Sequence, residues 1–298
     1  MASQYIRKAT HQGEWYSSDS EQLTKMFQAS FYYATTPKLD NLKGLISPHC
    51  CYDVCLRTAA YSYASINPDL YDRIILIGTC HHFPLQKCLV SGASEVETPF
   101  GNIVVDNEAL SNLCQQSPEL FDFLTQDQDE AEHSHEMQYP LIKYIFQDRD
   151  IQILPILIGS LSEENEIKIA EILSPLILAD RTLFIISSDF THWGEMFHFT
   201  TFANNRKPLS QQLVLFDEKA MNIISELNYS HFRFHISDIQ GSICGCYSIC
   251  LMLRILASGF SVQTLNRTEL CQLSTLKDFS ISFIAVAFCT SSHTEEEN

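Results

Sequence analysis

Five residues that can bind a metal ion or move a proton stand in or just after short apolar runs typical of strands. His49 closes KGLISPH, and His81 follows RIILIGTC. Asp189 and His192 lie in LFIISSDFTHW, and Cys244 lies in the glycine-flanked run GSICG. In open α/β sheets, chemistry collects at the ends of the strands. The sequence therefore predicts that the five side chains share one pocket, which would bind a metal or perform acid/base chemistry.

The spacing of these residues indicates how they could divide the work. His81 and His82 are adjacent, and neighbours on an extended segment point to opposite sides, so we expect one in the pocket and the other to be structural. Asp189 and His192 stand three apart, which on a helical turn places both on one side. The carboxylate could then orient the imidazole, or both could serve a substrate. The alternative is a helix-capping aspartate beside a surface histidine.

The chain has eleven cysteines, and they fall into three groups. Cys244 precedes an apolar segment expected to be helical, and a helix N-terminus favours the thiolate; Cys246 competes with it for this role. Four others crowd the region of His49 and His81 but lack the paired spacing of a structural zinc site: Cys50, Cys51, Cys55 and Cys80. Five more lie in apolar or amphipathic surroundings and are predicted to be small buried hydrophobes: Cys88, Cys114, Cys250, Cys271 and Cys289.

One further cluster lies in DEAEHSHEMQYP, which contains Glu132, His133, His135 and Glu136. Glu132 and Glu136 are four residues apart, as on many solvated helix faces, and this is the interpretation we favour. The segment does not match HExxH, because no second histidine follows at the required position. A zinc-protease type of site is therefore excluded.

The elements that would position these residues alternate along the chain. Apolar runs without strict alternation are typical of strands buried on both faces, and we expect them near 43–47, 73–78, 88–91, 151–158, 183–187 and 281–289. Amphipathic segments predict helices at 19–33, 54–66, 106–116, 134–147, 163–178, 210–227 and 246–258. This alternation predicts an α/β/α sandwich around a mixed, mostly parallel sheet.

Composition limits the class of protein. The 298 residues, 45% hydrophobic and 18% charged, predict one domain over 1–298, with 292–298 as a disordered acidic tail. The formal charge of −17 argues against nucleic acid as a partner. We find neither a signal-peptide core nor a run long enough to span a bilayer, and eleven is an odd number of cysteines. We therefore expect a cytoplasmic protein with reduced thiols and no membrane insertion.

Several motifs, in order, resemble the Memo (mediator of cell motility) family, whose fold is related to class III extradiol dioxygenases. They are RKATHQGEWY, ISPHCCY, ILIGTCHHFPL, TPFGNIVVD, EHSHEMQYP, ILPILIGSLS, FIISSDFTHWG and SICG, and they cover nearly the whole chain. The resemblance implies a single α/β domain with a metal pocket formed by His49, His81 and Cys244, with Asp189 and His192 alongside. It also implies iron or copper, redox activity, and binding of phosphotyrosine-containing receptor peptides in motility signalling.

The chain departs from the family pattern near the expected pocket. PHAGY becomes PHCCY, with Val54 where an aromatic residue is common, and the patterns EHSxEMHLP and CGxxP become EHSHEMQYP and CGCYS. The three expected ligands are retained, while the changes put peptide binding in question.

Two functions of different classes follow. The leading hypothesis is an intracellular protein that holds iron(II) or copper and carries out an oxidation. Two imidazoles and a thiolate form a softer donor set than two histidines and a carboxylate, so ring-cleaving dioxygenase activity is not expected from the fold alone. Softness favours copper(I) or zinc and competes with the iron that the resemblance implies; we expect iron(II) or copper, with zinc as the less favoured ion. The alternative is a non-enzymatic signalling adaptor that binds phosphotyrosine peptides, with Trp15 and Tyr16 lining the apolar wall of its pocket.

Overall fold

The structure, a computed structural model, describes residues 5–201, 206–239, 242–256 and 258–291; the predicted tail at 292–298 lies outside them. The strands are β1 (Ile6–Arg7), β2 (Leu42–Ser47), β3 (Arg73–Thr79), β4 (Cys88–Val90), β5 (Glu95–Val96), β6 (Ile103–Val105), β7 (Phe121–Phe123), β8 (Gln152–Ile158), β9 (Thr182–Ser187), β10 (His192–Trp193), β11 (Phe260–Glu269) and β12 (Ser280–Thr290). The helices are α1 (Ser20–Tyr33), α2 (Tyr52–Ala64), α3 (Asn107–Gln116), α4 (Gln126–Ala131), α5 (His133–Glu136), α6 (Tyr139–Phe146), α7 (Glu163–Ile177), α8 (Leu209–Ser225), α9 (Tyr229–Asp238) and α10 (Cys246–Ile255). Among the residues described, no helix combines the length and apolar character needed to cross a membrane.

The strands of the described chain join one mixed sheet. Its order is β1-β5-β6-β8-β3-β9-β2-β12-β10, with β11 paired to β12 and β4 paired to β7 and β8. The central run from β6 to β2 is parallel, whereas β12 is antiparallel to both β2 and β11. The carboxyl ends of β2, β3 and β9 therefore lie at the same edge, which is where the predicted site residues follow.

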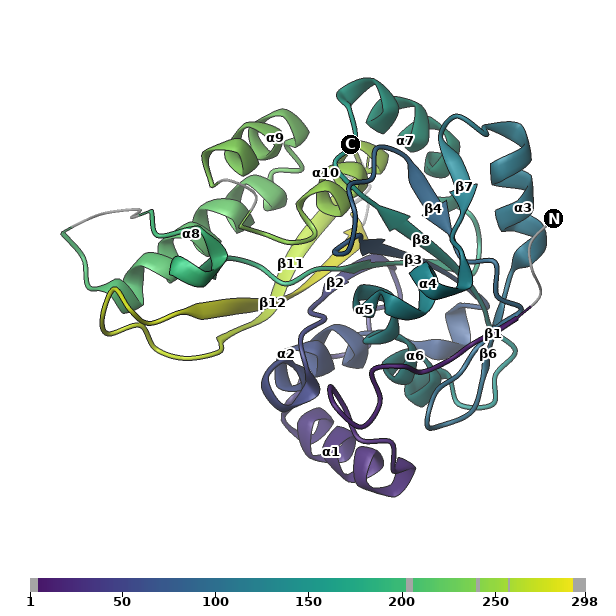
Figure 1. Ribbon diagram of the computed structural model, residues 1–298, viewed down its shortest axis with the longest axis horizontal. Coiled ribbons are helices and arrows are strands. Elements are labelled where there is room, and N and C mark those ends of the chain that lie inside the picture. The colour runs from purple at the N-terminus through teal and green to yellow at the C-terminus, as the bar shows by residue number, and fades with distance from the viewer. Residues whose placement is uncertain (1–4, 202–205, 240–241, 257, 292–298) are drawn as a thin grey trace, which may run out of the picture.

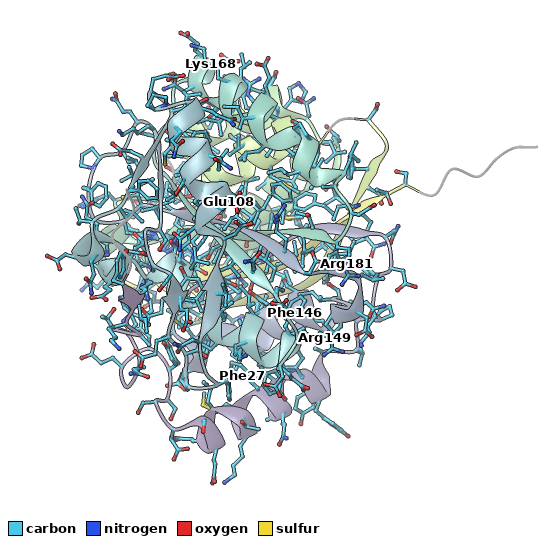
Figure 2. All side chains as sticks on the ribbon, turned by 90° about the vertical axis from the view of Figure 1, so that its right-hand side faces the viewer. Phe27, Glu108, Phe146, Arg149, Lys168 and Arg181 are labelled. Atoms are coloured by element: carbon cyan, nitrogen blue, oxygen red, sulfur yellow. The ribbon has the colours of Figure 1, made fainter. Side chains whose placement is uncertain are left out.

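Helices cover both faces of this sheet, which confirms the predicted α/β/α sandwich. Figure 1 shows α1, α2 and α6 on one side and α7 and α10 on the other, while α8 and α9 extend to one side together with part of β11 and β12. Between α1 and α6 the core is aromatic. Phe27 is fully buried with its ring centroid 4.9 Å from that of Tyr144, and Phe146 is also fully buried (Figure 2).

The central strands lack alternation because both of their faces are covered. Ile74, Ile75, Leu76 and Ile77 of β3 are all fully buried. The six strands predicted from such apolar runs are all present, with bounds shifted by no more than two residues. Of the five cysteines predicted to be small buried hydrophobes, Cys88, Cys250 and Cys289 are buried and Cys114 is half-buried. The prediction is wrong for Cys271, which is exposed on the loop after β11.

The helix predicted at 54–66 lies two residues earlier, at Tyr52–Ala64, and three other predicted helices also differ from the structure. The single helix expected at 134–147 is divided into α5 and α6, because Pro140 has no N–H to donate and is accommodated in the first turn of a new helix. The helix expected at 246–258 ends at Ile255, and residue 257 lies outside the described residues. The helix predicted at 210–227 ends at Ser225, and α9 follows as a separate element that was not predicted.

Candidate metal centre

The strand ends form a cavity of about 360 Å³ at the carboxyl edge of β2, β3 and β9. All five residues singled out at the ends of apolar runs line it: His49, His81, Asp189, His192 and Cys244. The lining is completed by two half-buried aromatic residues and four others: Trp15, Phe197, Cys50, His133, Ser242 and Ile281. His49, His81 and Asp189 meet in one pocket because the parallel strands that they follow end at one edge of the sheet. Cys244, 195 positions from His49, reaches the same pocket from the start of α10.

The imidazole of His49 is held in one tautomer. Its Nδ1 lies 2.9 Å from Ser187 Oγ, which donates its only hydrogen to the Ser134 carbonyl at 2.6 Å. Gln138 Nε2 also donates to Ser187 Oγ, at 2.9 Å. Because the hydroxyl hydrogen is already used, His49 Nδ1 must be the donor, and Nε2 retains its lone pair. Burial and the nearby imidazole of His81 hold the pKa of His49 well below its usual range, so the ring is neutral.

A carboxylate fixes His81 in the same way. His81 Nδ1 lies 2.8 Å from Glu132 Oε1, and the His81 backbone N–H donates to Glu132 Oε2 at 2.8 Å. A carboxylate only accepts, so Nδ1 carries a hydrogen, and in the neutral ring the lone pair is on Nε2. Burial opposes ionisation of Glu132, yet hydrogen bonding and the electrostatic field of His81 and His133 hold the pKa of its carboxyl well below its usual range. Carboxylate–histidine pairs of this kind are typical of metal-binding imidazoles.

Cys244 brings sulfur to the same point. Its Sγ lies 3.1 Å from His49 Nε2 and 3.2 Å from the Asp189 backbone nitrogen, which donates to it. The prediction that the adjacent helix N-terminus would make it a thiolate is wrong for the protein alone. Burial raises the pKa of the Cys244 thiol well above its usual value, with a further contribution from the negative field of Asp189. A cation bonded to the sulfur would supply the positive charge that stabilises a thiolate, which the helix N-terminus alone does not supply.

Asp189 and His192 do not lie on a helical turn, contrary to the sequence prediction. They follow β9 in an extended segment, and His192 begins β10. Asp189 Oδ1 accepts from the His49 backbone N–H at 2.8 Å, and burial raises the pKa of its carboxyl. His192 Nδ1 faces the carbonyls of Phe190 and Ser242 at 2.9 and 3.1 Å, so this ring also keeps its lone pair on Nε2. Both side chains line the pocket by way of extended backbone.

His133 is a pocket residue whose role the sequence did not indicate. Its ring stacks on that of His81, with centroids 4.2 Å apart, and lies 4.6 Å from the ring of Trp15. Burial and the positive field of His81 lower the pKa of His133 to about 3. The solvated helix face expected for this segment is wrong, because Glu132, His135 and Glu136 are all buried. Glu132 caps the start of α5, which is only one turn long and packs against β3.

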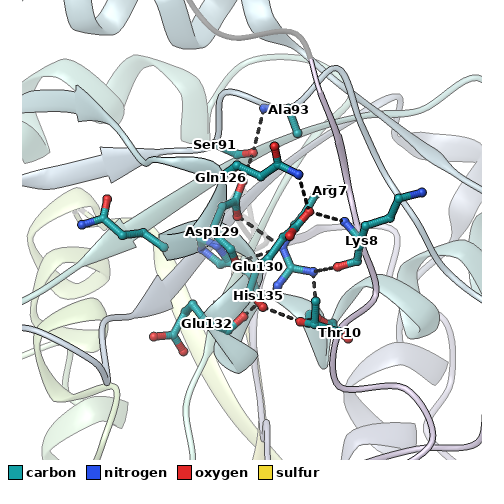
Figure 3. Close-up of polar contacts among 12 residues, drawn as sticks. Arg7, Lys8, Thr10, Ser91, Ala93, Gln126, Asp129, Glu130, Glu132 and His135 are labelled. Atoms are coloured by element: carbon teal, nitrogen blue, oxygen red, sulfur yellow. Dashed lines mark hydrogen bonds and ion pairs between the residues drawn. The ribbon is translucent and has the colours of Figure 1, made fainter.

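A buried arginine anchors this turn (Figure 3). Arg7 of β1 is fully buried and donates from Nη1 to Glu136 Oε2 at 2.7 Å and from Nε to Asp129 Oδ1 at 3.2 Å. Its Nη2 donates to the backbone carbonyl of Glu132 at 2.9 Å. The network therefore holds Glu132 in place: Arg7 binds the backbone carbonyl of Glu132, and the side-chain carboxylate of Glu132 orients His81.

Trp15 and Tyr16, predicted together as an apolar wall, occupy different places. Trp15 lines the pocket, whereas Tyr16 does not; it lines a neighbouring cavity and donates from its hydroxyl to Glu136 at 2.9 Å. Of the two adjacent histidines, His81 lines the pocket and His82 does not, as expected from their opposite directions.

Two overlapping groups of donor atoms in the pocket have the spacing of a metal site. One is His49, His81 and His133, and the other is His49, Asp189 and Cys244; within each group the donor atoms lie within 4.8 Å of one another. The fold and the pocket therefore define an α/β protein with a candidate metal centre of histidine, cysteine and aspartate at the carboxyl edge of its sheet.

Comparisons with known proteins identify the family. A family model described as Memo-like protein matches residues 7–286. A MEMO1 family protein of Schizosaccharomyces pombe is 32% identical over 318 residues, covering 98% of this chain and 95% of that protein. The Caenorhabditis elegans protein memo-1 homolog is 31% identical over 252 residues, covering 84% and 71%, and human protein MEMO1 is 27% identical over 289 residues, covering 94% and 96%. The chain belongs to the Memo-like family, which confirms the resemblance seen in its motifs.

Proposed function

We propose that the pocket binds a redox-active iron or copper ion through His49, His81 and Cys244. One observation carries this proposal. His49 Nε2, which carries a lone pair, lies 3.1 Å from Cys244 Sγ, and the ring of His81 stands edge-on to that of His49 with centroids 5.2 Å apart. Imidazole and thiolate ligands bind at roughly 2.0–2.3 Å from a metal ion. His81 and Cys244 each belong to a group of close donor atoms with His49, but not to the same group, so an ion held by all three side chains would require His81 and Cys244 to move toward each other.

The donor set fits the proposed ions. Two imidazoles and one thiolate suit copper and iron; the same set would also bind zinc, but zinc supplies no redox chemistry. A bound iron or copper ion would supply one-electron redox chemistry. Asp189 and His192 would then act on a substrate beside the ion, since the Asp189 carboxyl has a raised pKa and the His192 ring presents Nε2. Ring cleavage is not part of the proposal, because a fold related to dioxygenases does not imply their reaction.

A second candidate function is favoured by the apolar part of the lining. Trp15, Phe197 and Ile281 would accept the ring of a phosphotyrosine in an adaptor protein. The described lining contains histidines but neither lysine nor arginine, so the phosphate would depend on these histidines or on a bound ion. We propose a role in motility signalling in the cytoplasm for both candidate functions, the metal protein and the adaptor. The eleven free cysteines are consistent with a reducing compartment.

Metal analysis of protein purified without oxygen tests the first function. We expect stoichiometric iron or copper in the wild type, its loss in His81→Ala, and its retention in Asp189→Asn, with affinity reduced by at most about 10–100-fold because Asp189 acts beside the ion. Equal and complete loss in both folded variants would make Asp189 a direct ligand. Capture of a phosphotyrosine peptide by metal-free protein would favour the adaptor.

A further inference from the structure

A further group of metal donors shares His133 with the lining of the pocket and extends outward from it. His82, Glu132 and His133 each offer one ligand atom, and these three atoms lie within 4.8 Å of one another. Exposure increases outward across the group: Glu132 is buried, His133 is half-buried and His82 is exposed. The ring centroids of His82 and His133 are 6.5 Å apart. The group is therefore open to solvent on one side and anchored in the protein on the other.

The members of this group have unused bonding capacity. Within the described residues, the rings of His82 and His133 make no hydrogen bond, and His133 Nδ1 lies 3.5 Å from Glu132 Oε1. Glu132 Oε1 accepts from His81 Nδ1 and from the Ser134 backbone nitrogen, each at 2.8 Å, while Oε2 accepts from the His81 backbone nitrogen alone. Oε2 therefore retains a lone pair for a cation.

We propose that His82, Glu132 and His133 form a second cation site at the mouth of the pocket. Two imidazoles and one carboxylate, with no sulfur, suit a divalent ion such as iron(II) or zinc. Ligand distances of roughly 2.0–2.2 Å require the three donors to approach one another more closely, and the exposed His82 side chain is free to rotate toward the other two.

The second site shares no ligand with the set His49, His81 and Cys244, so both can be filled at once. They are nevertheless linked, because Glu132 holds His81 and the rings of His81 and His133 are stacked. Two nearby cations repel each other, so the second equivalent binds more weakly than the first. The second site does not depend on the proposed function, since none of its ligands belongs to the sulfur-containing site.

Titration of metal-free protein with Co²⁺ under nitrogen distinguishes the two sites. Cobalt bonded to Cys244 gives a sulfur-to-cobalt charge-transfer absorption, whereas cobalt on imidazole and carboxylate gives only weak ligand-field bands. We expect two equivalents in the wild type, of which one produces the charge-transfer band. His82→Ala should lose the equivalent without that band and keep the other. His231→Ala, which removes an exposed histidine on α9, is the matched control and should bind both.

Cys244→Ser separates the two proposals. Loss of the charge-transfer band with one equivalent still bound, and that equivalent abolished by adding His82→Ala, supports the second site. Binding of a single equivalent by the wild type, or of two by His82→Ala, would overturn it. An unchanged charge-transfer band in Cys244→Ser would instead refute the sulfur-containing site and leave the second site to be judged by His82→Ala alone.

Discussion

Three histidines of the pocket share one arrangement, in which Nδ1 faces an acceptor fixed by the fold. His49 uses Ser187, His81 uses Glu132, and His192 uses two backbone carbonyls. In its neutral form each ring therefore carries its lone pair on Nε2, the nitrogen that remains available to a cation. Preorganised ligands of this kind bind metal more tightly than freely rotating ones, because their orientation is fixed before binding.

Ser187→Ala tests this arrangement. The substitution removes the acceptor of His49 Nδ1 and frees the ring to rotate or change tautomer. We expect metal affinity at the sulfur-containing site to fall by about 10–100-fold, as is typical when a residue that orients a ligand is lost. The measurement is a competitive chelator titration.

The control for Ser187→Ala is Ser62→Ala. Ser62 is also fully buried and donates to a backbone carbonyl, that of Ile46 at 2.7 Å, but it lies in α2 and does not line the pocket. Ser62→Ala loses one buried hydrogen bond, at a cost of roughly 1 kcal/mol in folding stability, whereas Ser187→Ala loses three and should cost more. Equal metal affinity in the two variants would show that Ser187 does not position His49.

The sequence predicted which residues reach the pocket but not how they are oriented. His49, His81 and Cys244 were found because strand ends are visible as apolar runs. The partners Ser187 and Glu132 could not be assigned, because a hydrogen bond across more than 50 positions leaves no trace in local spacing. His133 was missed for a related reason: its four-residue helix is too short for its burial to show in a periodic pattern.

At the scale of elements, a close contact between α10 and the end of β9 places Cys244. A Cβ atom on Gly245 would lie 2.4 Å from both Cβ and Oγ of Ser188 and 3.0 Å from the Ser187 carbonyl oxygen. The Gly245 backbone N–H also donates to Ser188 Oγ at 3.1 Å. Glycine is required at this position because the helix start touches the backbone of the neighbouring segment.

Gly245→Ala should displace the start of α10 and with it the sulfur of Cys244. We expect a loss of roughly 1–3 kcal/mol in folding stability from overpacking, together with weaker metal binding. Adding Ser188→Gly removes the Cβ and Oγ that the new methyl group would meet, so the double variant should recover part of both losses. Calorimetry and chelator titration measure the two effects. Full affinity in Gly245→Ala would contradict a rigid placement of Cys244 by α10.

Central strands could be predicted from the sequence, but edge strands could not. β3, β8 and β9 are covered on both faces and therefore consist of continuous apolar residues. β11, with the sequence FSVQTLNRTE, is mostly polar and half exposed, and it is a strand because it pairs along nearly all of β12. A strand of this kind forms only because it pairs with a partner strand elsewhere in the chain. The local amino-acid sequence gives no information about that partner.

At the scale of the whole molecule, one sheet connects the N-terminal and C-terminal parts of the chain. β1 lies at one end of the strand order, whereas β12 lies beside β2 near the other. We propose on this basis that residues 1–298 form one Memo-like domain. The formal charge of −17 also favours the approach of cations to the pocket, an effect that weakens as salt concentration rises.

A single domain should unfold in a single step. We expect one calorimetric transition in metal-free protein, with the van't Hoff and calorimetric enthalpies in agreement. The transition should move to higher temperature with added metal, because the folded state alone holds the assembled site. Two resolved transitions, only one of which responds to metal, would contradict the single-domain proposal.

The most direct test of the proposed centre is whether a bound ion protects Cys244. Metal-free and metal-loaded protein would be alkylated at several pH values and read residue by residue by mass spectrometry, with exposed Cys271 as the internal reference that labels equally in both states. Because the pKa of the Cys244 thiol is raised in the protein alone, metal must displace its proton, so occupancy should fall as pH falls. We predict selective protection of Cys244 on loading, lost again in acid together with the metal. Unchanged labelling of Cys244 in fully loaded protein would contradict the proposal that its sulfur binds the ion.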